Sequence, residues 1–152
     1  MDKIDRKILQ ILQTNARASL QEIGQAVGLS QSPCWNRIKK MEDSGVIEGY
    51  TVRLNAAALN LGETVLVQVT LDSHSDNTLE KFGEVLAKIP EVVEAYLVSG
   101  DYDYLLRIAV SGTQDYERLL REKLYKIKGI RHSKSSFVLR TLKKADLPLL
   151  GV

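Results

Sequence analysis

Two short helical patterns that are separated by only three residues constrain this sequence more than any other feature. The stretch from Ser19 to Glu22 has the form of a capping box, in which the serine hydroxyl and the glutamate carboxylate each accept an amide proton at a helix start. Gly28 is placed to end that helix, and Ser30 to cap a second helix that continues to about Asp43. Two helices joined by a tight turn that contains glycine predict a helix-turn-helix unit.

The flanking residues complete a small N-terminal domain. Residues 4–14 carry apolar side chains at helical spacing, and Asp2 and Asp5 place negative charge at the positive end of that helix. Residues 46–54 have the pattern of a strand. We therefore predict a helix-turn-helix domain over residues 1–54, followed by a small, polar linker over residues 55–63.

The second half of the chain has a different pattern. Its apolar periodicity predicts strands and helices in the order β-α-β-β-α-β, over residues 65–71, 79–89, 92–99, 104–110, 114–126 and 130–141. This order is that of the ferredoxin-like fold, so the chain belongs to the α+β class, with a second domain over residues 64–152. An antiparallel sheet with both helices on one face leaves its other face available for dimerisation.

Charge and composition limit the possible functions. No apolar run approaches the roughly 20 residues needed to cross a bilayer, so we expect no membrane partner. A single cysteine, Cys34, excludes an intrachain disulfide and suits the reducing cytoplasm. Residues 1–60 hold eight Lys/Arg and six Asp/Glu, whereas residues 61–152 hold thirteen of each. Any binding to DNA must therefore depend on a few well-placed cations and on several modules acting together.

The third predicted helix carries the candidate DNA contacts. Cys34, Ile38 and Met41 share one face and are expected to be buried, with Cys34 serving as a small hydrophobic residue. Asparagine can pair bidentately with adenine, and lysine can meet phosphate. The alternative is an ordinary solvated helix, and partial burial is expected for the tryptophan. The candidate DNA-binding residues are Gln31, Ser32, Trp35, Asn36, Arg37, Lys39 and Lys40.

A second candidate site lies between two predicted strands of the C-terminal domain. It combines carboxylates and phenols with backbone amides, the mixture that an amino acid ligand requires. A plain hairpin turn would use the same residue types, so this alternative stays open. The candidate effector-binding residues are Gly100, Asp101, Tyr102, Asp103 and Tyr104, together with Ser133 and Ser135 of the last predicted strand. We expect no metal site, no catalytic residues and no cofactor, because no ligand cluster, phosphate loop or nucleophile–base signature is present.

The segment Val-Gly-Leu-Ser-Gln-Ser-Pro-Cys-Trp-Asn-Arg-Ile-Lys-Lys-Met-Glu-Asp-Ser-Gly-Val-Ile-Glu-Gly-Tyr, residues 27–50, closely resembles the helix-turn-helix of the Lrp/AsnC (leucine-responsive, feast/famine) regulators. Further matches are Asp-Arg-Lys-Ile-Leu at residues 5–9, Gly-Asp-Tyr-Asp-Tyr-Leu-Leu at 100–106 and Leu-Pro at 147–148. The resemblance extends over nearly the whole chain, in order and at the family's spacing.

This resemblance implies a winged-helix-like DNA domain, a linking strand and a ferredoxin-like sensor domain. It also implies pairing through the sensor domains, often with further assembly into rings of four dimers, and an effector amino acid bound between sensor domains near residues 100–104. The expected protein is thus a cytoplasmic transcription regulator that binds double-stranded DNA, forms a homodimer or an octamer and responds to an amino acid. The alternatives are an enzyme built on the same sheet, and an amino-acid-binding adaptor that does not contact DNA.

Overall fold

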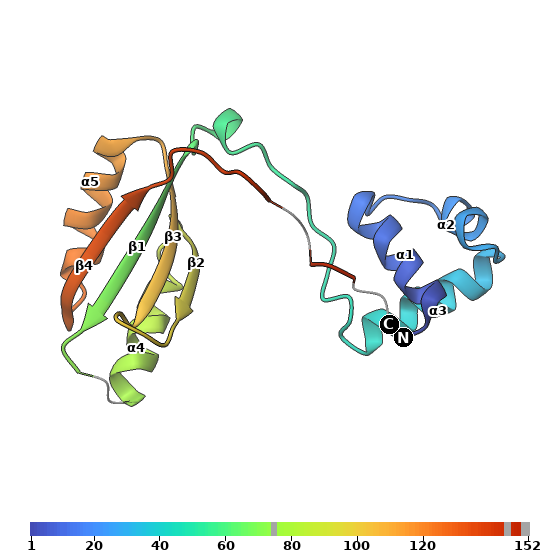
Figure 1. The fold of residues 1–152 in the computed structure, drawn as a ribbon, viewed down its shortest axis with the longest axis horizontal. Coiled ribbons are helices and arrows are strands. Elements are labelled where there is room, and N and C mark those ends of the chain that lie inside the picture. The colour runs from blue at the N-terminus through green and yellow to red at the C-terminus, as the bar shows by residue number, and fades with distance from the viewer. Residues whose placement is uncertain (74–75, 145–146, 150–152) are drawn as a thin grey trace. The chain divides into compact units, whose positions relative to one another are not determined.

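The chain forms two compact units in a computed structural model that describes residues 1–73, 76–144 and 147–149 (Figure 1). Of the described residues, the first unit comprises Met1–Arg53 with 143–144 and 147–149, and the second comprises those within Leu54–Leu142. The sequence places all residues after 63 in the C-terminal domain, whereas the described residues at the C-terminal end group with the N-terminal helices. Leu149 packs against the core of those helices, and the Gln13 side-chain amide donates to the Leu147 carbonyl at 3.1 Å.

Three helices form the N-terminal unit: α1 (Lys3–Thr14), α2 (Leu20–Val27) and α3 (Gln31–Asp43). The predicted capping box is confirmed at α2, where the Glu22 amide donates to the Ser19 hydroxyl at 3.2 Å and the Ser19 amide donates to the Glu22 carboxylate at 2.7 Å. The hydrogen bonds that the Ser19 amide and then the Ser19 hydroxyl donate to the Glu22 carboxylate hold the pKa of Glu22 below its usual value. Gly28 ends α2 in the left-handed conformation, with φ of 73°.

The turn between α2 and α3 depends on a close approach at Gly24. A Cβ at this position would lie 2.5 Å from the carbonyl oxygen of Leu29 and 3.7 Å from the sulfur of Cys34. The Leu29 amide also donates to the Gly24 carbonyl at 2.9 Å, which fixes the chain at this distance. The absence of a side chain at Gly24 therefore lets the turn pack directly on α2.

Two local predictions for this unit are wrong. Ser30 occupies the N-cap position of α3 but makes no side-chain capping bond. Residues 46–54 form no strand, and the side chains of Val52 and Leu54 are 74% and 69% exposed. An alternating pattern forms a strand only beside a neighbour that completes its hydrogen bonds, and the described residues of this chain supply no such neighbour here. The linker that follows contains one short 3-10 helix, η1 (Ala57–Leu59).

The C-terminal unit has the predicted ferredoxin-like architecture. Its elements are β1 (Glu63–Leu71), α4 (Asp76–Leu86), β2 (Val92–Leu97), β3 (Tyr104–Val110), α5 (Thr113–Glu122), the 3-10 helix η2 (Leu124–Lys126) and β4 (Ile130–Phe137). The strands pair in the order β2-β3-β1-β4, and every pair is antiparallel. The last strand ends before the predicted residue 141, and the predicted helix over residues 114–126 divides into α5 and η2.

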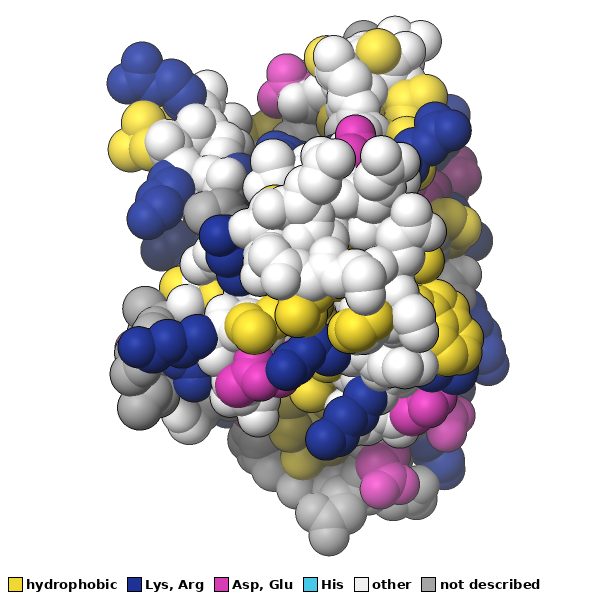
Figure 2. Space-filling view, turned by 90° about the vertical axis from the view of Figure 1, so that its right-hand side faces the viewer, with side chains coloured by type: hydrophobic (Ala, Val, Ile, Leu, Met, Phe, Trp, Pro, Cys, Tyr) yellow, Lys and Arg dark blue, Asp and Glu magenta, His cyan; other side chains and the backbone are white. Residues whose placement is uncertain are grey.

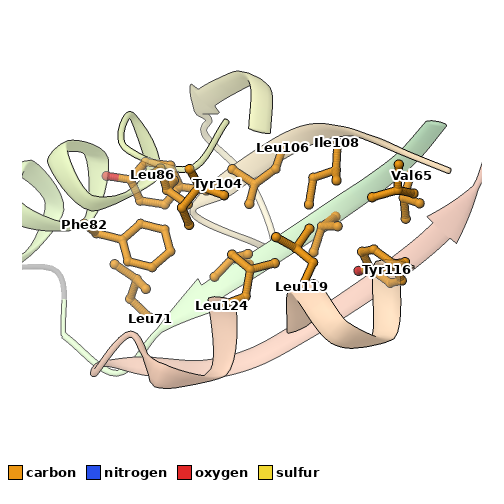
Figure 3. Close-up of a cluster of buried hydrophobic side chains, with 14 residues drawn as sticks. Val65, Leu71, Phe82, Leu86, Tyr104, Leu106, Ile108, Tyr116, Leu119 and Leu124 are labelled. Atoms are coloured by element: carbon orange, nitrogen blue, oxygen red, sulfur yellow. The ribbon is translucent and has the colours of Figure 1, made fainter. Parts of the chain in front are cut away.

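One face of this sheet carries the core (Figure 3). Alternate residues of β1 and β3, starting at Val65 and Tyr104, pack against Phe82 of α4 and Tyr116 of α5. Each fully buried aliphatic side chain of such a core stabilises the fold by about 1.5–3 kcal/mol. Both helices therefore cover the same face, and the opposite face carries the intervening half-buried residues, which include Leu66, Leu105 and Ala109. Within the described ranges, no helix is long and apolar enough to span a membrane.

Candidate DNA interface and effector loop

Helix α3 has one buried face and one exposed face, as predicted. Cys34, Ile38 and Met41 are buried, and Cys34 is fully inaccessible within the core of the N-terminal unit. Trp35, for which the sequence predicts partial burial, is 53% exposed and lies beside the buried face. The outer face presents a set of exposed polar side chains, namely Gln31, Ser32, Asn36, Lys39 and Lys40.

The two lysines of this outer face differ in their surroundings. The Lys39 ammonium lies 3.0 Å from the Asp43 carboxylate and 4.0 Å from the Glu42 carboxylate, and its hydrogen bond to Asp43 raises the pKa of Lys39. Lys40 has no ion-pair partner among the residues that the structure describes. Lys40 can therefore meet a phosphate without first leaving a carboxylate, whereas Lys39 must exchange one partner for another.

Arg37 differs more strongly from the prediction. Its Nη1 atom donates to Asp2 Oδ2 at 2.7 Å and to Asp5 Oδ1 at 2.6 Å, so the guanidinium is held by two carboxylates at the start of α1. These hydrogen bonds, first to Asp5 and then to Asp2, raise the pKa of Arg37. From the sequence, both aspartates are expected to serve only the charge of their own helix end, because nothing in the local spacing links them to a residue more than thirty positions away.

Lysine and arginine side chains do not gather into a single patch in the view of Figure 2. Lysine and arginine side chains surround a broad area of uncharged polar side chains and backbone, and acidic side chains lie among them. This distribution agrees with the small excess of two positive charges in residues 1–60, where eight cationic residues face six acidic ones. A single copy of this unit can thus neutralise only a few phosphates.

The loop between β2 and β3 contains part of the predicted effector site at the surface. Gly100 has φ of 131°, a conformation that side chains disfavour, and the space around its missing Cβ is open. Asp101 is exposed, and Tyr102 is half-buried. These three residues form a tip with one carboxylate, one phenol and accessible backbone.

The other two residues of the predicted loop make hydrogen bonds within their own domain. Asp103 accepts a hydrogen bond from the Leu71 amide at 2.7 Å, and its own amide donates to the Val69 carbonyl at 2.9 Å. Tyr104 lies within the buried cluster (Figure 3) and is only 5% exposed, and its hydroxyl donates to the Leu79 carbonyl at 2.7 Å. We therefore withdraw Tyr104 as an effector contact, because its polar atom is already bonded within its own domain. Its alternation with the buried residues of β3 could have indicated this from the sequence.

Ser133 and Ser135 lie on the helix-covered side of the sheet. They pair with Val69 and Val67 of β1, whose side chains are buried, and directly paired residues point to the same face. The hydroxyl of Ser135 is hydrogen-bonded to the hydroxyl of Tyr116. Ser133 lies level with Tyr104 at the end of the loop, because both pair with Val69 from opposite sides of β1, and Ser135 already has a partner. The described residues contain no group of three or more His, Cys, Asp or Glu arranged to hold a metal ion.

A helix-turn-helix with a polar outer face, joined to a ferredoxin-like domain, defines a DNA-binding regulator with a separate sensing domain. Residues 1–42 match the AsnC-type helix-turn-helix domain, and residues 64–148 match the Lrp/AsnC ligand binding domain. The chain belongs to the Lrp/AsnC family of transcription regulators, which is not a family of enzymes.

Individual relatives agree with this assignment. The chain is 37% identical over 146 residues to the leucine-responsive regulatory protein of Escherichia coli K12, an alignment that covers 96% of this chain and 89% of the relative. An AsnC family transcriptional regulator from Agrobacterium tumefaciens has 42% identity and a TM-score of 0.93 over 98% of this chain and 97% of its own. A transcriptional regulator from Neisseria meningitidis, solved as a complex with L-methionine, has 34% identity and a TM-score of 0.93 over the same shares of the two chains.

Proposed function

We propose that this regulator recognises double-stranded DNA through the outer face of α3 and that a small amino acid bound to its C-terminal domain modulates this binding. The observation that carries the DNA part is the division of α3 into a buried face and an exposed face with Ser32, Asn36 and Lys40. The neighbour solved with L-methionine supports an amino acid as the effector. The site of action that we propose is the cytoplasm.

In this proposal the exposed residues of α3 divide into two groups. Asn36 contacts a base edge, where its amide can donate and accept at an adenine, and Gln31 and Ser32 contribute further base contacts near the start of the helix. Lys40 contacts phosphate, and Lys39 does so once it releases Asp43. Trp35 packs its exposed surface against the DNA backbone.

Binding to duplex DNA over a range of salt concentrations tests this division. The probes are a duplex enriched by the protein from a random-sequence pool and a non-specific poly(dI-dC) duplex. Lys40→Ala should weaken both complexes and lower the salt slope by about one, because one phosphate contact is lost. Lys88→Ala, which removes an equally exposed lysine from the C-terminal unit, is the matched control and should change neither quantity. Equal effects of the two variants would contradict the proposed interface.

For the effector, we propose a site at the tip formed by Gly100, Asp101 and Tyr102. Asp101 is exposed, so its carboxylate can hold the ammonium group of an amino acid, and such a charge-assisted bond contributes about 1.5–3 kcal/mol. The Gly100 backbone can approach the ligand closely because no Cβ intervenes. Ser133 and Asp103 remain candidates for a supporting role.

Calorimetric titration of the twenty amino acids identifies the effector, and the Asp101→Ala variant then tests the site. We expect the variant to retain DNA binding and to lose the effect of the amino acid on it, since a ligand shifts an equilibrium only by its differential affinity. Glu84→Ala, which removes an exposed carboxylate from α4, is the control. If Asp101→Ala binds the effector as tightly as the wild type, the site lies elsewhere.

We also propose that the chain forms a homodimer through the uncovered face of its sheet, with octamers as the larger assembly. That face carries Leu66 and Leu105 beside the ion pair of Arg107 and Glu94, at 2.6 Å, so it combines apolar area with charge. A dimer also doubles the number of phosphates that the weakly cationic N-terminal units can neutralise. Light scattering that shows only a 17.0 kDa species at micromolar concentration would exclude this assembly.

A further inference from the structure

A cluster of three charges connects the start of α1 to the DNA-reading helix. Arg37 Nη1 bridges Asp2 Oδ2 and Asp5 Oδ1 at 2.7 and 2.6 Å, and the side chains of Arg37, Asp2 and Asp5 are 32%, 52% and 16% exposed. An isolated surface ion pair contributes little to stability. A network that includes one largely buried carboxylate is screened less by solvent, and fixing its side chains costs less entropy for each ion pair. Arg37 therefore has a defined position in the folded unit.

The two carboxylates are already held in place by α1 itself. Asp2 Oδ1 accepts from the amides of Ile4 and Asp5 at 2.8 and 2.9 Å, and Asp5 Oδ2 accepts from the Asp2 amide at 2.9 Å. Each aspartate thus uses one oxygen for the capping box and offers the other to Arg37. The acceptor for the guanidinium is preorganised, so forming the bridge orders few additional groups.

The position of Arg37 on α3 makes this bridge important for recognition. Arg37 follows Asn36 directly and precedes Lys40 by almost one helical turn, and all three residues line one open hollow together with Asp2 and Asp5. The buried residues of α3 make apolar contacts, which have no preferred direction, whereas the two hydrogen bonds of Arg37 depend on the direction of the guanidinium and so oppose rotation of the helix about its axis. A rotation would displace Asn36 and Lys40 together.

We propose that Arg37 is a positioning residue of the DNA-reading helix, clamped by Asp2 and Asp5, and that it does not itself contact phosphate. This inference rests on the proposed DNA interface and revises the direct DNA contact predicted for Arg37 from the sequence. The clamp sets the orientation of α3, and its one positive charge also offsets one of the two negative charges of Asp2 and Asp5, which would otherwise repel the DNA.

A pair of charge-neutralising variants distinguishes a positioning role of Arg37 from a direct phosphate contact, because the two roles predict opposite changes in DNA affinity. Asp5→Asn keeps an oxygen for the Asp2 amide but removes the more buried of the two carboxylates that accept from Arg37. If Arg37 positions α3, this variant weakens the selected duplex about tenfold, the scale of one lost base contact, although it removes a negative charge. Asp43→Asn removes the same charge from the other side of α3 and releases Lys39, so it should bind DNA more tightly than the wild type.

Tighter DNA binding by both variants would overturn the proposal, because it would mean that the aspartates withhold Arg37 from phosphate. If Asp5→Asn does not fold, Asp2→Ser repeats the test, since a serine hydroxyl still caps α1 while one of the two carboxylates that hold Arg37 is gone. Circular dichroism and tryptophan fluorescence establish that each variant is folded under the binding conditions.

The salt dependence of Arg37→Met gives an independent measurement. If Arg37 positions α3, the variant should bind the selected duplex more weakly but keep the salt slope of the wild type. If Arg37 contacts a phosphate, the variant should lower the slope by about one. A lowered slope would overturn the inference. Failure of the wild-type protein to bind any duplex would instead refute the proposed function, so the two failures are distinguishable.

Discussion

Gly24 lies within α2, where alanine would ordinarily stabilise a helix by about 0.8–1 kcal/mol relative to glycine. The structure reverses this expectation, because the added Cβ would lie 2.5 Å from the Leu29 carbonyl oxygen. That oxygen belongs to the backbone of the turn, which cannot move away as the end of a flexible side chain can. Gly24→Ala should therefore push the turn and the start of α3 away from α2.

The expected size of the effect follows from two opposing contributions. Adding a methyl group to a tightly packed site costs about 1–3 kcal/mol, and the contact with backbone places Gly24 toward the upper end of that range. The gain in helix propensity offsets about 1 kcal/mol of this cost. We expect the N-terminal unit of Gly24→Ala to lose about 2 kcal/mol of stability.

Urea denaturation followed by tryptophan fluorescence measures this quantity selectively. The chain has a single tryptophan, Trp35, which lies on α3, so its fluorescence reports the N-terminal unit alone. The matched control is Gly83→Ala in α4, where an added Cβ would meet no atom within 4 Å. The control should leave the fluorescence transition unchanged and stabilise the C-terminal unit, observed by circular dichroism, by about 0.5–1 kcal/mol.

A Gly24→Ala variant as stable as the wild type, or more stable, would refute this reasoning. It would mean that the turn can retreat by several tenths of an ångström at no cost, and that the close approach of Leu29 is not required for the helix-turn-helix.

Three further outcomes are expected. Asn36→Ala should weaken the selected duplex by about 1–3 kcal/mol and leave poly(dI-dC) binding unchanged, because only base recognition is lost; equal losses on both duplexes would contradict its role. Tyr104→Phe should destabilise the C-terminal unit by about 1 kcal/mol, measured by urea denaturation, through loss of the bond to the Leu79 carbonyl, and should leave effector affinity unchanged. The backbone hydrogen bonds at the two capping boxes lower the pKa values of Asp2 and Glu22. The stability that these two carboxylates contribute to the N-terminal unit should therefore be fully present above about pH 5 and be lost as the pH falls through the lowered pKa values. A midpoint of the tryptophan-monitored urea transition that is constant from about pH 5 to 2 would contradict this.

The features that the sequence predicted correctly depend on residues that are close together in the chain. The capping box of Ser19 and Glu22 joins positions three apart, and its hydrogen bonds form in any helix that begins there. The buried face of α3 and the alternating strands of the sheet follow from helical and strand periodicity in the same way. The order of these elements was sufficient to indicate both domains.

The features that required the tertiary structure depend on partners distant in sequence. The strand pattern at Val52 and Leu54 was present, but a strand also needs a neighbour, which these residues lack in the described chain. The phenol of Tyr104 is a group that could contact an amino acid ligand. Only the position of Leu79 in the fold shows that its hydroxyl already donates to a backbone carbonyl. Arg37 meets Asp5 across 32 residues. Local patterns specify which conformation a segment adopts, whereas the partner of a charged or polar group depends on how the segments pack. The sequence therefore supplied candidate site residues, and only the packing showed which of them already have partners within the fold.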